Sequence, residues 1–191
     1  MNNGSRRARN PFVAGADGCP GGWICILLDR KSGMLAPLLC RTTETLLTIK
    51  PEPAVLAIDI PILPDSGVRD CDQVARKLLG PRRSRVFPAP RRPALLAVTQ
   101  QAADAIGREI DGKGVGAQAW GLYRRVLSVD LLMSPDEQQR CVEVHPELSF
   151  WALNREVPLG HSKHLPEGIA ERLALIESAF GSEAFSTVRR A

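Results

Sequence analysis

The chain has 191 residues, of which 44% are hydrophobic and 24% charged, and its formal net charge is +4. This composition is typical of an ordinary soluble globular protein, and the length gives no reason to expect more than one domain. No apolar stretch approaches the roughly 18 residues that a membrane helix needs, so we expect neither a membrane span nor a membrane partner.

The N-terminal part of the chain predicts three antiparallel strands. Residues 1–11 are polar and basic, and we expect a disordered tail there. Two apolar runs flank Pro20-Gly21-Gly22, which is typical of a hairpin, and a third run follows a polar turn. The three runs are Phe12 to Ala16, Trp23 to Leu28 and Met34 to Cys40.

A helix and a buried strand come next. Thr42 or Thr43 can cap a short helix that ends at Lys50. The run Ala54 to Ile60 is apolar throughout except for Asp59, which is typical of a strand buried on both faces and parallel to its neighbour.

The remaining segments are mostly helical. Helical character is predicted for Asp70 to Leu79, Leu95 to Ile110, Gln118 to Leu132 and Gly168 to Phe180. The segment from Cys141 to Pro146 predicts a fifth strand that ends at the proline. This order of elements predicts an α/β fold with a five-stranded mixed sheet, in which strands 1–3 are antiparallel and strands 4 and 5 are parallel.

Two aspartates stand inside apolar runs. A carboxylate in such a place costs several kcal/mol unless it is compensated, and a metal ion is one compensator. Asp17 is followed by Gly18, so a hairpin turn explains it as well as a site does. For Asp59, between Ile58 and Ile60, the alternatives are a helix cap or a buried, hydrogen-bonded carboxylate.

A third acidic group lies at the end of the fifth strand. Alternation points Glu143 and His145 to one face, and Glu147 follows the proline. Sheets of this class commonly bind ligands at the carboxyl ends of their strands. Acids at three strand ends can hold Mg²⁺ or Mn²⁺, which prefer carboxylate oxygen, although a lone histidine is more often structural.

Basic residues gather between Gln73 and Ala103, where there is no acidic residue. Such a run can follow the phosphates of DNA or RNA, and a solvated basic loop is the equal alternative. The five cysteines are scattered and form no C-x-x-C pair, which argues against zinc and disulfides and favours a reducing cytoplasm.

From Val13 to about Arg172 the chain resembles the DUF429 family of predicted nucleases with a ribonuclease H-like fold. The matching segments are Gly15 to Trp23, Ala57 to Pro61, Arg82 to Pro90, Gly114 to Trp120, Glu143 to Phe150, and Ser162-Lys163 with Pro166 to Gly168. The resemblance implies that residues 12–191 form a single ribonuclease H-like domain, with Asp17 and Asp59 side by side on its first and fourth strands.

The chain departs from the family pattern in three places. The turn Pro61 to Pro64 is one residue shorter, and Ala117 replaces an expected serine. Relatives also carry a C-terminal helix with an Asp-Asp-x-Leu-Asp-Ala type segment, which we expect this domain to lack. Glu143 or Glu147 would then replace its acid, unless the site is inactive.

The leading hypothesis is a metal-dependent nuclease that uses Mg²⁺ or Mn²⁺. The expected catalytic residues are Asp17, Asp59, Glu143, His145 and Glu147, of which Asp17, Asp59 and Glu143 bind metal. The expected nucleic-acid-binding residues are Arg82, Arg83, Arg85 and Lys163. Alternatives are an inactive binding module for nucleic acid or nucleotides, and a phosphotransfer enzyme. The aromatic side chains, Phe87 among them, are expected in the core.

Overall fold

A computed structural model describes residues 10–63, 69–184 and 186. They form two compact units: the first takes the chain up to residue 59 and from residue 135 onward, and the second takes residues 60–134. Most of the predicted tail, residues 1–9, lies outside the described residues, and the single-domain boundary of 12–191 stays a prediction. Within the described residues, every helix is too short or too polar to span a bilayer.

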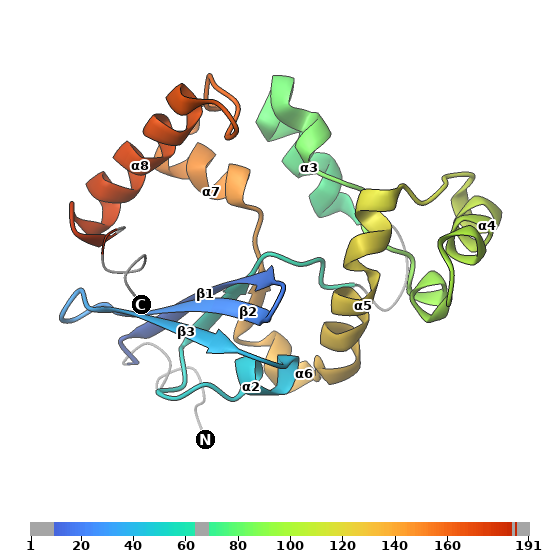
Figure 1. Ribbon diagram of the computed structural model, residues 1–191, viewed down its shortest axis with the longest axis horizontal. Helices are drawn as coiled ribbons and strands as arrows, with labels where there is room; N and C mark the ends of the chain where they lie inside the picture. The colour runs from blue at the N-terminus through green and yellow to red at the C-terminus, as the bar shows by residue number, and fades with distance from the viewer. Residues whose placement is uncertain (1–9, 64–68, 185, 187–191) are drawn as a thin grey trace. The chain divides into compact units, whose positions relative to one another are not determined.

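The first unit is built on an open five-stranded sheet (Figure 1). Its strand order is β3-β2-β1-β4-β5. Neighbours β3, β2 and β1 pair antiparallel, and β1, β4 and β5 pair parallel, which confirms the predicted α/β mixed sheet. The strands are β1 (Phe12–Cys19), β2 (Gly22–Asp29), β3 (Leu35–Cys40), β4 (Val55–Ile58) and β5 (Cys141–Glu143).

The two faces of this sheet differ in burial. Ala14, Ala16, Cys25 and Leu27 alternate with more exposed residues along β1 and β2 and are buried on one face. Helix α2 (Thr43–Leu47) contacts this part of the sheet, where the Trp23 indole donates to the Thr43 hydroxyl at 3.2 Å. The other face carries exposed apolar side chains, including Ile24, Leu39, Val55 and Val142.

The first hairpin turns at Pro20 and Gly21, where the sequence predicts it, but the strand that leads into the turn is longer than predicted. Strand β1 continues to Cys19 rather than ending at Ala16, so Asp17 lies within the strand, opposite Ile24. The turn itself uses Pro20 and Gly21, and Gly22 has a φ of +131°. A Cβ on Gly22 would lie 2.3 Å from the Cys40 carbonyl oxygen, so close strand packing explains this part of the motif.

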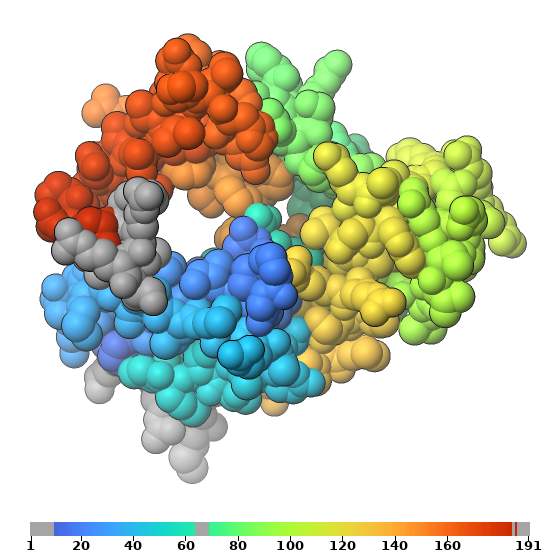
Figure 2. All heavy atoms as spheres, viewed as in Figure 1, coloured from blue at the N-terminus to red at the C-terminus, as the bar shows by residue number. Residues whose placement is uncertain are grey.

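Three further helices lie in the described part of the first unit, and two of them were not predicted. The chain leaves β5 after Glu143, and Pro146 begins a helix rather than only ending the strand. Proline is well suited to a first helical position because its missing N–H has no partner there in any case. The helices are α6 (Pro135–Gln138), α7 (Pro146–Leu153) and α8 (Pro166–Phe180). In Figure 2, α7 and α8 lie against each other.

The second unit is helical. Helix α4 begins at Gln100 rather than near Leu95, because Thr99 is its cap and accepts a hydrogen bond from the Ala102 N–H at 3.2 Å. Leu95 lies instead in a short 3₁₀ turn. The elements are α3 (Asp70–Leu79), η1 (Gly80–Arg85), η2 (Arg92–Leu96), α4 (Gln100–Asp111) and α5 (Ala117–Leu132).

Candidate functional site

Asp17 and Asp59 lie next to each other where the parallel pairing of β1 with β4 ends. The register pairs Ala16 with Ile58, and the Asp59 N–H donates to the Ala16 carbonyl at 2.9 Å, so pairing continues one residue further. Paired residues on neighbouring strands share a face. Since Ala16 and Ile58 are buried on one face, the two carboxylates point to the other.

The two carboxylates differ in exposure. Asp17 is exposed, and one of its carboxylate oxygens accepts from the Gly18 N–H at 2.6 Å. Asp59 is half-buried. This gives the pair one solvent-accessible acid and one partly desolvated acid on the same face of the sheet.

The environment of Asp59 disfavours its negative charge. Burial raises its pKa from 3.8 to about 6, and repulsion from Asp17 adds to this effect. The charges of His145 and Lys163 act in the opposite direction, and Glu143 adds a small further increase. Five predicted site residues of the first unit are therefore close enough for their charges to interact.

The third predicted metal ligand is placed less directly. Strand β5 pairs Glu143 with Ile58, so strand alternation puts Glu143 on the face opposite to Asp59. His145 follows the strand and is the N-cap of α7. Within residues 10–63, 69–184 and 186, no group of three or more His, Cys, Asp or Glu side chains is close enough to hold a metal ion.

Glu147 is part of a buried ion pair. Its carboxylate accepts from the Arg172 guanidinium at 2.7 Å, and both side chains are only 10% exposed. The same guanidinium donates to the carbonyls of Gly168 and His161 and lies over the Phe150 ring. These contacts join α7 to α8, which gives Glu147 a structural role that accounts for its burial.

The predicted phosphate-binding residues fall in both units. Lys163 is exposed in the loop before α8, in the first unit with Asp17 and Asp59. Arg82, Arg83 and Arg85 form part of η1 in the second unit, where Arg83 is exposed and the other two are half-buried.

Two carboxylates in this arrangement fit a hard divalent cation. Mg²⁺ is usually held by one or two carboxylates together with waters and substrate phosphates, so a third protein ligand is not required. A cation would also offset both causes of the raised pKa of Asp59, the burial of its charge and the repulsion from Asp17. The donor set therefore suits Mg²⁺ or Mn²⁺ better than zinc, which takes nitrogen and sulfur ligands in closed sites.

The prediction from the sequence was wrong for Phe87, and none was made for Arg172. Phe87, expected in the core, is 47% exposed. The partnership of Arg172 with Glu147 had no local signal, because the two residues are 25 positions apart and meet only when α7 and α8 pack.

Comparison with known proteins identifies one family. The family model described as "Protein of unknown function (DUF429)" matches residues 15–191, which is nearly the whole chain. No curated protein and no solved structure matches the chain.

Proposed function

The chain belongs to the DUF429 family, and we propose that it is a metal-dependent phosphodiesterase of the ribonuclease H-like class that cleaves nucleic acid. The observation that carries this proposal is the adjacency of Asp17 and Asp59 where the parallel pairing of β1 with β4 ends. Burial, and after it repulsion from Asp17, raises the pKa of Asp59, and binding of a divalent cation would relieve the repulsion.

In this proposal, Asp17 and Asp59 bind Mg²⁺ or Mn²⁺ directly. When bound, such a metal lowers the pKa of a coordinated water and neutralises charge on a phosphodiester. Glu143 acts on the site through its charge rather than as a direct ligand, in keeping with its place on the other face of the sheet. His145 would order a water near the metal, and Lys163 would hold a phosphate oxygen by its charge.

The charge distribution supports nucleic acid as the substrate. Seven arginine or lysine residues and no acid occur between Gln73 and Ala103, and Arg82, Arg83 and Arg85 stand together on η1. Guanidinium groups bind phosphate oxygens through paired hydrogen bonds, so η1 suits the backbone of DNA or RNA.

The test is cleavage of fluorescently labelled DNA and RNA oligonucleotides in the presence of Mn²⁺. We expect Asp17→Asn and Asp59→Asn each to reduce the rate at least about a hundredfold, because each removes a metal ligand. Asp136→Asn is the matched control, since this exposed aspartate of α6 belongs to the same unit and has no part in the site. Undiminished cleavage by either site variant would reject the assignment.

A catalytically inactive nucleic-acid-binding module is the second candidate. It is favoured by the fact that the described residues hold no cluster of three potential metal ligands. An inactive module would bind oligonucleotides in a salt-dependent way. It would not cleave them with Mg²⁺ or Mn²⁺ under any condition in which it stays folded.

A further inference from the structure

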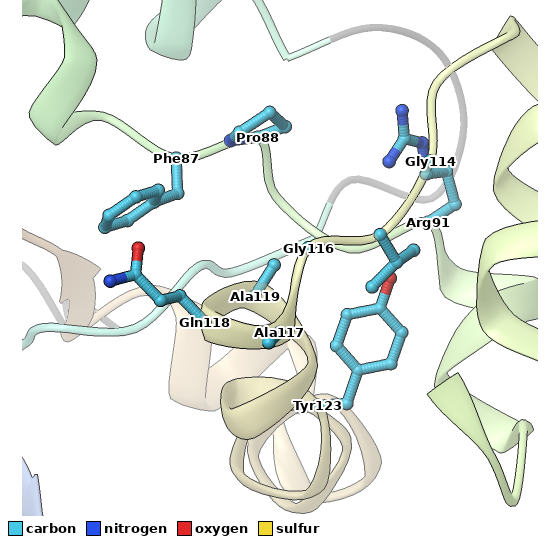
Figure 3. A pocket seen from close by; sticks show the side chains of 10 residues that line it. Phe87, Pro88, Arg91, Gly114, Gly116, Ala117, Gln118, Ala119 and Tyr123 are labelled. Atoms are coloured by element: carbon cyan, nitrogen blue, oxygen red, sulfur yellow. The ribbon is translucent and has the colours of Figure 1, made fainter. Parts of the chain in front are cut away.

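A pocket of about 360 Å³ lies wholly within the second unit. It is formed between the segment that carries Phe87 and Pro88 and the first turn of α5, as Figure 3 shows. Tyr123 lies at its base and is almost completely buried. Its walls come from the two family segments Arg82 to Pro90 and Gly114 to Trp120, which the metal site does not use.

One wall of this pocket is held firmly in place. The Val115 N–H donates to the Asp104 carboxylate at 2.8 Å, and the Val115 carbonyl accepts from the Gln100 amide at 2.9 Å. Gly114 passes so close to α4 that a Cβ there would lie 2.3 Å from the Asp104 carboxylate. The backbone that lines the pocket is therefore fixed before any ligand binds, which lowers the entropic cost of binding.

The opposite wall presents an aromatic ring to solvent. Phe87 is 47% exposed although it follows directly after the buried Val86. The Val86 carbonyl accepts two hydrogen bonds from the Arg76 guanidinium, at 3.0 and 3.2 Å. Arg76 thus anchors the backbone that carries Phe87, and the ring stays at the mouth of the pocket.

The polar groups of the pocket suit a neutral ligand better than a phosphate. Arg91 is bound to both carboxylate oxygens of Asp111, at 2.6 and 2.7 Å, so its charge is already balanced. The Gln118 amide faces the Phe87 ring across the pocket. An amide offers both a donor and an acceptor, which matches the edge of a nucleobase.

We propose that this pocket binds one unpaired nucleobase of a single-stranded nucleic acid, stacked on Phe87 and hydrogen-bonded at its edge by Gln118. This inference rests on the proposed function for the identity of the ligand. The arginines of η1, which ends two residues before Phe87, contact the phosphates on either side of the bound base. They are Arg82, Arg83 and Arg85. An aromatic platform beside basic residues is a common arrangement for binding single strands with little sequence preference.

The experiment measures binding of a fluorescein-labelled single-stranded oligonucleotide by anisotropy, in EDTA so that no cleavage occurs. We expect Phe87→Ala to weaken binding about tenfold, which is the usual effect of removing one stacking ring. Phe87→Trp keeps the affinity, and the fluorescence of the new indole is quenched when a base stacks on it. Gln118→Ala weakens binding severalfold. Phe180→Ala, which removes a phenylalanine of nearly equal exposure (49%) from α8, leaves binding unchanged.

Normal binding by Phe87→Ala, or an equal loss in Phe180→Ala, would overturn the proposal. If Phe87→Ala does not fold, the fluorescence of Phe87→Trp and the affinity of Gln118→Ala decide in its place.

A duplex and the free nucleoside monophosphates, measured in the same way, test the identity of the ligand. Equal affinity for the duplex contradicts an unpaired base, and tight binding of a monophosphate that the strand cannot displace contradicts a strand ligand.

The outcome is separable from that of the proposed function. Loss of binding in Phe87→Ala without cleavage by the wild-type protein supports the pocket and rejects the nuclease. Cleavage that depends on Asp17 and Asp59, combined with normal binding by Phe87→Ala, supports the nuclease and rejects the pocket.

Discussion

Asp59 and Glu147 are acidic residues of the same unit whose immediate neighbours have opposite charges. Asp59 lies beside Asp17, and burial together with this second negative charge raises its pKa to about 6. Glu147 instead accepts from Arg172 at 2.7 Å. A buried acid beside another acid is costly until a cation binds, whereas an acid with an arginine partner is already neutralised. The contrast makes the strand ends the better place for the proposed cation, whereas the contact between α7 and α8 serves structural support.

The largest effect is expected when the neutralised pair is broken. Arg172→Ala leaves Glu147 buried without its cation, and we expect the free energy of unfolding to fall by about 3–5 kcal/mol in urea titrations. Arg41→Ala, at an exposed arginine of the same unit, should change it by less than about 0.5 kcal/mol. A loss below about 1 kcal/mol in Arg172→Ala would show that the pair does not support the helices.

The second effect tests the strand-end acids with metal alone. At a Mn²⁺ concentration about 100 times its Kd, the folded protein should gain about 2.7 kcal/mol of stability, seen as a rise in Tm. Asp59→Asn should abolish this gain because it removes a ligand, and Glu147→Gln should keep it although the protein is less stable. A Mn²⁺ response that survives Asp59→Asn would place the metal elsewhere.

A smaller effect follows from the burial of the Asp59 charge and its repulsion by Asp17. Without metal at pH 7.5, Asp59→Asn should be about 1 kcal/mol more stable than the wild type, after allowance for solvent screening at a half-buried carboxyl. Asp59→Asn would then lose cleavage activity while gaining stability, whereas Arg172→Ala loses stability. A destabilised Asp59→Asn would mean that the carboxylate serves the fold.

The same group gives a pH dependence with a definite sign. The pKa of Asp59 is about 6 when folded and near 3.8 when unfolded, so between pH 4 and 6 the folded state keeps a proton that the unfolded state has lost. Stability from this group therefore falls as pH rises through that window. The measurement is the free energy of unfolding of the wild type and of Asp59→Asn at each pH. The difference between the two isolates the contribution of Asp59, because the other carboxylates contribute equally to both proteins. A difference that stays constant with pH would contradict the raised pKa.

The smallest effect concerns phosphate contacts. Arg83→Ala should weaken oligonucleotide binding a few fold and reduce the slope of log Kd against log salt by about 0.7 if one phosphate contact of a single strand is lost. Arg124→Ala, at an exposed arginine of α5 in the same unit, is the control. Equal slopes of log Kd against log salt in Arg83→Ala and the wild type would mean that η1 is a solvated surface that makes no phosphate contact.

The sheet could be predicted because its signals are local. Apolar runs of strand length, the Pro20-Gly21-Gly22 turn and the helices between later strands predict the order of the elements along the chain and the antiparallel pairing of the first three strands. The adjacency of Asp17 and Asp59 on the first and fourth strands was instead implied by the family resemblance, and the pairing of β1 with β4 agrees with it. The length of β1 was wrong by three residues, since the Asp17-Gly18 pair is equally compatible with a turn and with a strand.

The rest depends on contacts between distant segments. The partner of Glu147 is set by how α7 meets α8, and neither helix encodes it alone. Phe87 was expected in the core because aromatic residues are usually buried, but Arg76 anchors the preceding backbone and the ring remains exposed. The pocket beside it needs the close passage of Gly114 over Asp104, which periodicity does not reveal.

The direct passage from β5 into α7 has a consequence for how this protein can vary. Only Val144 and His145 separate the strand from the helix, and the Val144 N–H still donates to the Ile58 carbonyl. Each added residue would turn the start of the helix by about 100°. A single insertion would therefore rotate Glu147 away from Arg172. We expect insertions and deletions to be rejected at this junction, which makes it a fixed point for aligning related chains.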